Sequence, residues 1–171
     1  TVSRRYSWEI QTPEYGAGLD GILRKRSDRL FGILNGADYT AWNPETDEFI
    51  AANYSPDDLS GKEKCKKDLL KEFDLPYIPG KPVIGMVSRL TGQKGFDLLM
   101  EAVPDMMIRD MQLVILGAGE RKYHDYFNSI TDLYPDRLRV KLAYDNAIAH
   151  KIEAGCDMFL MPVSYTHLRA H

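Results

Sequence analysis

The sequence Val83-Ile-Gly-Met-Val-Ser-Arg-Leu-Thr-Gly-Gln-Lys-Gly95 predicts a strand, a phosphate-sized loop and the start of a helix. Its apolar beginning, Val83 to Val87, has the length and the β-branched residues of a short buried strand. A glycine-bounded loop follows, and a helical pattern begins at Phe96. In a parallel α/β unit such a loop lies at the carboxyl end of a strand and beside a helix amino terminus, where N–H groups and the helix dipole favour an anion.

The same alternation of strand and helix continues toward the carboxyl end of the chain. Further apolar strands are expected at 112–116, 138–142 and 157–161, and amphipathic helices at 96–109, 121–134 and 146–154. Strands separated by amphipathic helices indicate right-handed crossovers. The sequence therefore predicts an α/β fold with a doubly wound, Rossmann-like parallel sheet.

Before residue 83 the pattern is less regular. Ser3 is a predicted N-cap of a short helix, a second helical pattern covers 19–27, and Leu30 to Leu34 has the apolarity of a buried strand. Residues 39–60 are broken by prolines and acidic residues, which indicates an inter-domain connection. A charged amphipathic helix is expected at 60–73.

Composition and charge exclude several classes of function. The chain has 171 residues, 44% hydrophobic and 27% charged, and a net charge of −3, which gives no reason to expect nucleic acid as a partner. The basic residues Arg24, Lys25, Arg26 and Arg29 are interpreted as a solvated helix face. No apolar run has the length of a membrane span, so no membrane partner is expected.

The two cysteines indicate a reducing compartment. Cys65 and Cys156 lie far apart in the sequence, each in a pattern typical of a buried segment. Buried, reduced thiols fit this spacing better than a disulfide framework, so a cytoplasmic location is expected.

Two cations in the first loop are candidates for binding a phosphate. Arg89 and Lys94 could hold the diphosphate of a nucleotide and stabilise its charge as it leaves, and the alternative is a surface ion pair. After the second strand, Gly117 and Gly119 resemble the dinucleotide fingerprint G-x-G-x-x-G, but Lys122 replaces the third glycine, which argues against a dehydrogenase. These two glycines either allow a ligand to approach the backbone or form a plain tight turn.

Two further residues follow strand ends. Tyr144 comes after the third strand, where an aromatic ring either stacks on a base or packs against the protein. Asn35 ends the expected strand at 30–34, and Asn-Gly is most often a turn. His124 and His150 lack metal-ligand spacing, so no metal site is expected.

Several motifs, in order, resemble the bacterial glycogen synthase and plastid starch synthase family. The resemblance covers residues 1 to about 162. Its motifs are Glu9-Ile-Gln-Thr-Pro-Glu-Tyr-Gly16, Gly18-Leu-Asp-Gly21, Ile33-Leu-Asn-Gly36, Trp42-Asn-Pro44, Tyr54-Ser55, Leu59-Ser-Gly-Lys62, Ser88-Arg-Leu-Thr-Gly-Gln-Lys-Gly95, Gly117-Ala-Gly-Glu120 and residues 144–162.

The resemblance implies a GT-B glycosyltransferase, in which two Rossmann-like domains close on a cleft. It implies transfer of glucose from ADP-glucose, with retention, to the non-reducing end of an α-1,4-glucan such as glycogen. On this interpretation residues 1–37 are the end of the amino-terminal, acceptor-side domain and the seam, and 38–162 are the first part of the carboxyl-terminal, nucleotide-sugar-binding domain.

The resemblance also implies roles for individual residues. Arg89 and Lys94 would hold the ADP diphosphate, Asn35 would face the acceptor glucan, and Tyr144 would face the adenine. Gly117 and Gly119 would line the nucleotide pocket. The family works without a bound metal or other cofactor, so none is expected.

Two departures from the family pattern lead to further expectations. The family's amino-terminal Lys-x-Gly-Gly loop and histidine are absent, and residues 163–171 replace its Ser-Arg-Phe-Glu-Pro-Cys-Gly continuation, which suggests a non-native tail. The 171-residue chain is therefore expected to be an inactive fragment. The alternatives are another nucleotide-sugar-dependent transferase of the same fold, or a non-catalytic nucleotide-binding fragment.

Overall fold

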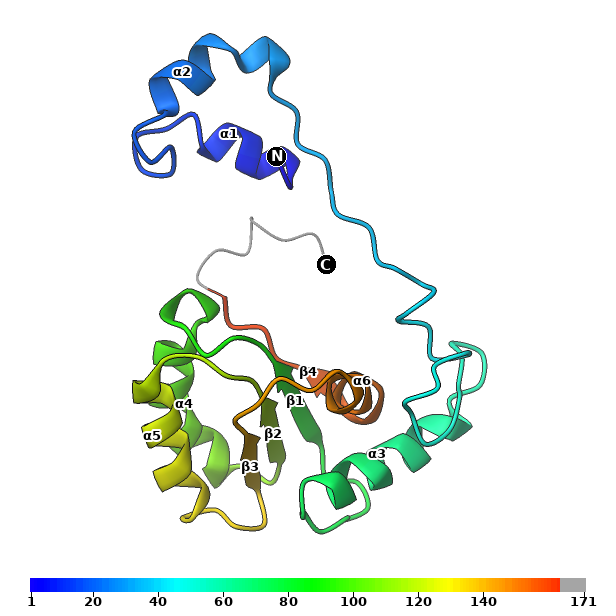
Figure 1. The fold of residues 1–171 in the computed structure, drawn as a ribbon. Coiled ribbons are helices and arrows are strands. Elements are labelled where there is room, and N and C mark those ends of the chain that lie inside the picture. The colour runs from blue at the N-terminus through cyan, green and yellow to red at the C-terminus, as the bar shows by residue number, and fades with distance from the viewer. Residues whose placement is uncertain (164–171) are drawn as a thin grey trace. The chain divides into compact units, whose positions relative to one another are not determined.

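The computed structural model describes residues 1–163, and the chain divides into two compact units (Figure 1). The first unit contains Thr1–Tyr39, and the second begins at Thr40 and includes the rest of the described chain. The sequence predicted the end of the amino-terminal domain and the seam within residues 1–37 and the start of the next domain at residue 38. Apart from Val163, the predicted non-native tail lies outside the described residues.

The first unit has two short helices whose ends follow the sequence. Helix α1 spans Arg4–Glu9, and its N-cap Ser3 accepts a hydrogen bond from the backbone N–H of Tyr6 at 3.0 Å, as predicted. Helix α2 spans Asp20–Lys25 and is followed by the 3₁₀ turn η1, Ser27–Arg29. The four basic residues of this region are all exposed, which confirms the prediction of a solvated face.

The predicted buried strand at 30–34 is wrong. Residues 31–38 have no regular secondary structure, and Phe31 and Ile33 are 69% and 72% exposed. Two hydrogen bonds join this segment to the start of the chain, from the Thr1 amino group to the Phe31 carbonyl (2.8 Å) and from the Ile33 N–H to the Thr1 carbonyl (2.7 Å). Two bonds do not make a sheet, and within the described first unit no other element covers these apolar side chains.

The second unit is built on a sheet of parallel strands. The strands are β1 (Val83–Val87), β2 (Gln112–Leu116), β3 (Leu138–Lys141) and β4 (Met158–Phe159), in the spatial order β3-β2-β1-β4. The predicted fourth strand, 157–161, is longer than the observed one, although the N–H groups of Asp157 and Leu160 still donate to carbonyls of β1 at 2.8 Å. The predicted doubly wound parallel sheet is therefore present.

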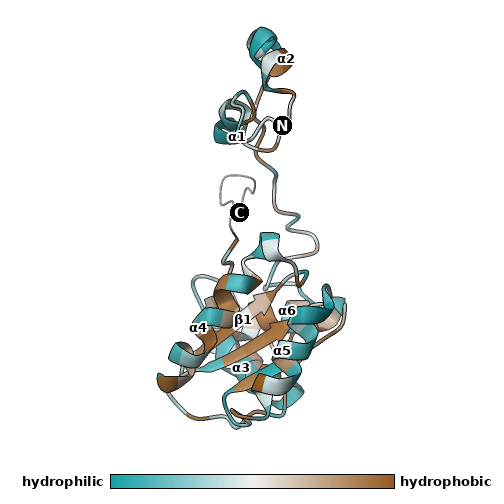
Figure 2. Ribbon diagram, turned by 90° about the vertical axis from the view of Figure 1, so that its left-hand side faces the viewer, coloured by the Kyte–Doolittle hydropathy of each residue, from teal (hydrophilic) through white to brown (hydrophobic). Residues whose placement is uncertain are grey.

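Helices cover both faces of this sheet (Figure 1). Helices α4 (Phe96–Ile108) and α5 (Arg121–Thr131) lie on one face, and α3 (Ser60–Glu72) and α6 (Asn146–Gly155) lie on the other. The 3₁₀ turn η2 (Gly92–Lys94) precedes α4. In Figure 2 the central strands are mostly brown, that is hydrophobic, whereas the helices carry both teal and brown residues.

Alternate residues of the central strands divide the core into two clusters, as the pleat of a sheet requires. Leu113 and Ile115 of β2 face α4 and α5, whereas Val114 and Leu116 face α3 and α6. On the first face the ring of Phe96 packs on two aromatic rings of α5, with ring centroids 5.4 and 5.9 Å apart. The sequence predicted these faces because the alternation typical of strands and the spacing typical of helices each repeat several times along it.

Residues 40–59 have no regular secondary structure, in agreement with the irregular pattern of the sequence, and they pack on α6 within the second unit, to which they belong. The indole of Trp42 stacks on the imidazole of His150 in α6, with ring centroids 3.9 Å apart and an interplanar angle of 5°. The Nδ1 atom of His150 lies 2.7 Å from a carboxylate oxygen of Asp47, and both side chains are buried. These contacts fasten the irregular segment to α6.

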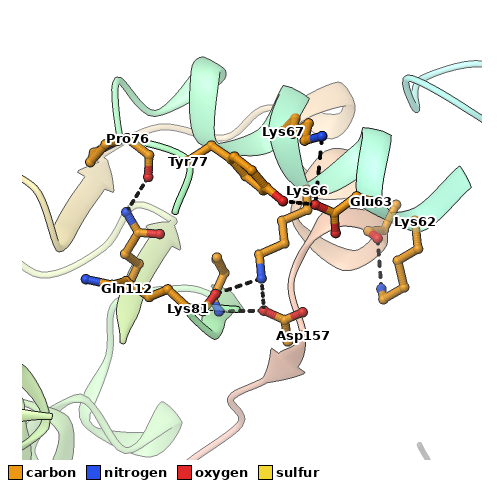
Figure 3. Close-up of polar contacts among 11 residues, drawn as sticks. Lys62, Glu63, Lys66, Lys67, Pro76, Tyr77, Lys81, Gln112 and Asp157 are labelled. Carbon is orange, nitrogen blue, oxygen red and sulfur yellow. Dashed lines mark hydrogen bonds and ion pairs between the residues drawn. The ribbon is translucent and has the colours of Figure 1, made fainter. Parts of the chain in front are cut away.

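A second polar cluster lies at the amino ends of β1 and β4 (Figure 3). The ammonium of Lys66 in α3 donates to the Lys81 carbonyl at 2.7 Å and to the Asp157 carboxylate at 2.8 Å. The same carboxylate accepts the N–H of Val83 at 2.6 Å. One lysine therefore ties α3 to the start of two adjacent strands.

Candidate functional site

The carboxyl ends of β1, β2 and β3 lie at one edge of the sheet, and a loop follows each of them. The strand order is β3-β2-β1-β4. From β1 the chain crosses over to β2 and then β3 on one side of β1, whereas β4 lies on the other side of β1. Ligands of open α/β sheets bind at such a reversal of strand order. The loop after β1, residues 88–95, therefore occupies the position at which this topology favours a ligand.

The loops after β1 and β2 lie against each other. The N–H of Leu90 donates to the Ala118 carbonyl at 3.0 Å, and the Leu90 carbonyl accepts the N–H of Glu120 at 2.8 Å. A Cβ atom on Gly119 would lie 2.1 Å from the Leu90 carbonyl oxygen, and one on Gly117 would lie 1.9 Å from that of Ser88. Both glycines are needed because the backbone of the loop after β2 approaches the backbone of the loop after β1. The sequence pattern alone did not distinguish this close approach from a tight turn.

Arg89 is exposed at this edge. Its carbonyl accepts the N–H of Thr91 at 3.0 Å, which fixes the backbone on either side of Leu90. Among residues 1–163 the guanidinium has no ion-pair partner, so the alternative of a surface ion pair is not observed for Arg89. A guanidinium presented in this way is available for the oxygen atoms of a phosphate.

Lys94 has a different environment from Arg89. It ends η2 and is only 2% exposed. The next residue, Gly95, has φ = 74°, and a Cβ atom there would lie 1.7 Å from the Pro162 carbonyl oxygen, so the segment after β4 packs directly on this loop. For the ammonium of Lys94 to contact a ligand, the groups that cover it must move.

Tyr144 is 93% exposed in the loop between β3 and α6. The alternative that its ring packs against the protein is therefore wrong. The next residue, Asp145, is the N-cap of α6 and accepts the N–H of Ile148 at 2.9 Å, which fixes the end of the loop. The ring is thus a free aromatic surface beside an ordered helix start, as stacking on a base requires.

Asn35 is exposed in the first unit and is not one of these sheet-edge residues. The alternative of an Asn-Gly turn is not observed, because no turn is assigned between residues 31 and 38. The structure therefore groups five of the six predicted site residues on adjoining loops of the second unit: Arg89, Lys94, Gly117, Gly119 and Tyr144.

Sequence reasoning missed His124, which contributes to the same group of loops. Its Nε2 atom accepts the backbone N–H of Gly119 at 3.1 Å. The sequence contained one sign of this contact, a side chain with a hydrogen-bond acceptor in the first turns of the helix that follows the glycine loop. Metal-ligand spacing, the only criterion applied to the histidines, does not detect this contact.

Neither a metal centre nor a membrane span is found in the part of the chain that the structure describes. Within residues 1–163 no three His, Cys, Asp or Glu side chains are grouped so that they could hold a metal ion. None of the helices in this range has the length and apolarity needed to cross a bilayer.

A parallel sheet with helices on both faces and glycine-containing loops at its carboxyl edge defines a Rossmann-like α/β domain. The sequence model of the family "Glycosyl transferases group 1" matches residues 70–168, which is more than half of the chain. The chain belongs to this family.

Individual relatives show which members of this family the chain resembles. Glycogen synthase 1 of Geobacter metallireducens is 53% identical over 165 residues, which are 96% of this chain and 33% of the relative. Soluble starch synthase 1 of Solanum tuberosum is 49% identical over 162 residues, 95% of this chain and 25% of the relative. The chain thus spans about a third or less of these relatives, and the predicted family resemblance is confirmed.

A solved structure supports the fold assignment. The catalytic domain of starch synthase IV from Arabidopsis thaliana, bound to ADP and acarbose, matches with a TM-score of 0.90 and 36% identity over 96% of this chain and 34% of that chain. This likeness confirms the predicted α/β fold of GT-B type.

Proposed function

We propose that this chain is part of a retaining glucosyltransferase that moves glucose from ADP-glucose to the non-reducing end of an α-1,4-glucan. The observation that carries the proposal is the group of loops at the carboxyl edge of the sheet, where an exposed arginine, a close pair of glycine-containing loops and a free tyrosine ring adjoin. The names of the relatives, glycogen synthase and starch synthase, support the choice of donor and acceptor.

The proposed nucleotide position follows the strand ends. The ADP diphosphate lies at the loop after β1, where Arg89 and, after a local rearrangement, Lys94 contact its oxygen atoms. The adenine stacks on Tyr144, and Gly117 and Gly119 line the pocket between them. Asn35 in the first unit faces the acceptor glucan.

The proposed chemistry is mainly electrostatic. Breaking the bond between glucose and the diphosphate develops positive charge on the sugar ring and negative charge on ADP. A guanidinium and an ammonium at the diphosphate stabilise this charge more strongly in the transition state than in the ground state, which accelerates the reaction. The proposal requires no metal or other cofactor, because the two cations take the place that a divalent ion has in other transferases.

Two buried thiols support the proposed location. Cys65 and Cys156 are buried free thiols, and burial raises the pKa of the Cys156 thiol to about 11. This pair fits a reducing compartment, and we propose that the enzyme acts in the cytoplasm on glycogen, without nucleic acid or membrane as a partner.

Nucleotide binding by the chain itself is the first test. Isothermal titration of the full 171-residue chain with ADP, and with UDP and GDP as controls, should show binding of ADP. Absence of binding to all three nucleotides would contradict the proposed site. Tighter binding of UDP would favour another nucleotide-sugar transferase of the same fold.

Transfer activity is the second test. Residues 1–163 can replace the matching segment of the Geobacter metallireducens glycogen synthase, with the unaltered enzyme as the control. The chimeric enzyme should incorporate labelled glucose into glycogen from ADP-glucose and much less from UDP-glucose. A chimera that is folded, binds ADP and transfers no glucose would favour the alternative of a non-catalytic nucleotide-binding fragment.

A further inference from the structure

We propose that His124 is a positioning residue that holds the loop 117–120 in the shape that accepts a nucleotide. The inference rests on the proposed function, because it concerns the same site. It starts from one contact, in which the Nε2 atom of His124 accepts the backbone N–H of Gly119 at 3.1 Å. No role for this residue follows from the strand-end pattern that identified the other site residues.

The direction of the Gly119 N–H explains why it needs a partner. The parallel pairing of Leu90 with this loop uses the carbonyl of Ala118 and the N–H of Glu120. In a parallel ladder the peptide groups of the intervening residue point to the opposite side, away from the paired strand. The N–H of Gly119 therefore points away from Leu90, and the imidazole of α5 supplies its acceptor.

The contact defines the chemical state of His124. An imidazole nitrogen accepts a hydrogen bond only when it carries no proton, so the neutral ring must carry its proton on Nδ1. An imidazolium has no acceptor and could not hold Gly119.

The consequence for binding is preorganisation. The loop has two glycines within three residues, so its backbone is intrinsically free to adopt other conformations. Pairing with Leu90 fixes one side of the loop, and His124 fixes the other. A nucleotide then binds without first having to order the loop, and removal of the acceptor should weaken binding rather than abolish the fold.

Three variants of the full chain separate positioning from a general structural effect. His124→Phe keeps a ring but removes the acceptor, and His124→Gln offers an amide oxygen at a reach similar to that of Nε2. Asp125→Asn changes the next, exposed residue of α5 and is the matched control. The probe is ADP, measured by calorimetry.

The expected result is a Kd for ADP raised about fivefold to tenfold in His124→Phe, close to the wild-type value in His124→Gln, and unchanged in Asp125→Asn. Equal affinity of His124→Phe and the wild type would overturn the inference. If His124→Phe does not fold, the tautomer of His124 in the wild-type chain, measured as described below, decides.

A measurement without ligand distinguishes this inference from the proposed function. Nitrogen-15 NMR of the wild-type chain should show His124 with the proton on Nδ1 and a bare Nε2, and the Gly119 amide should exchange with solvent faster in His124→Phe. A proton on Nε2, or unchanged exchange, overturns the positioning role. If the wild type shows the expected tautomer and exchange but does not bind ADP, the contact stands and the proposed function, with the nucleotide role of the loop, is refuted.

Discussion

The hydroxyl of Tyr126 donates a hydrogen bond to the backbone carbonyl of Met100 across 2.8 Å. This carbonyl lies four residues before Pro104, which has no N–H and therefore cannot complete the intrahelical bond in α4. A side chain of α5 thus supplies the donor that the sequence of α4 lacks. Burial also raises the pKa of Tyr126, so the hydroxyl stays protonated and able to donate.

This relationship predicts a loss of stability in Tyr126→Phe. The variant should lower the free energy of unfolding by about 1 kcal/mol, measured by urea denaturation, because the carbonyl of Met100 loses its donor. In a Pro104→Ala background the N–H of residue 104 can bond to that carbonyl, so the same substitution should cost less. Equal costs in both backgrounds would show that the Met100 carbonyl is not the reason.

The polar cluster of Figure 3 predicts a larger effect for Lys66. Lys66→Met leaves the carboxylate of Asp157 without its ammonium partner, and the side chains of the two are 9% and 38% exposed. We expect a loss of about 2 kcal/mol, below the cost of breaking a fully buried pair, because water reaches Asp157. Lys64→Met on the exposed side of α3 is the control and should lie within about 0.5 kcal/mol of the wild type.

Glu72 predicts a dependence of stability on pH. Its carboxylate accepts hydrogen bonds from Lys141 and Lys151, and the ammonium of Lys141 is the main group that holds the pKa of Glu72 below its usual value. A lowered folded-state pKa stabilises the protein above the unfolded-state pKa, and this contribution is lost as the pH falls through the folded-state pKa.

The matching variant is Glu72→Gln. At pH 7 it should be less stable than the wild type by up to about 1 kcal/mol, since the pair is partly exposed. At a pH below the lowered folded-state pKa of Glu72 the two proteins should differ little, because the wild-type carboxyl is then protonated. Urea denaturation at both pH values measures this, and a difference that does not change with pH would contradict the assignment.

Arg89 and Lys94 predict a specific kinetic pattern in the chimeric synthase. Arg89→Ala or Lys94→Ala should lower kcat by about 100-fold, a typical cost of removing one group that stabilises transition-state charge, and should change glucan affinity far less. Arg109→Ala, an exposed arginine just after α4, is the control. Equal losses in turnover and in glucan binding would argue against a role at the diphosphate.

Lys94 needs an additional control because it is buried. Its substitution can destabilise the loop by itself, so the thermal unfolding of Lys94→Ala should be compared with that of Arg89→Ala, whose side chain is exposed. A variant that keeps its melting temperature and loses turnover supports direct contact with the donor.

The regular part of the chain could be predicted from the sequence because its periodic patterns are local. The strand at Val83 and the helices after it bury faces that recur every two or every three to four residues. The apolar run at 30–34 has the same local character, yet it is not a buried strand. Burial depends on which elements lie against a segment, and no local pattern contains that information.

The candidate site could be predicted only in part, for the same reason. Position at a strand end identified Arg89 and Tyr144, since topology alone brings strand ends together. The burial of Lys94 depends on a later segment that packs on its loop, and the contact from His124 to Gly119 depends on the orientation of one side chain in the helix that directly follows its loop. Neither feature leaves a periodic signal in the sequence.

Because Trp42 stacks on His150, its fluorescence is an intrinsic probe of the folding of the second unit. The chain has two tryptophans, Trp8 in the first unit and Trp42 in the second, and within residues 1–163 it is the indole of Trp42 that stacks on an imidazole, which can quench its emission. Replacing either indole by phenylalanine leaves a single tryptophan, located in one unit. Fluorescence can therefore follow the melting of each unit separately, without any attached dye.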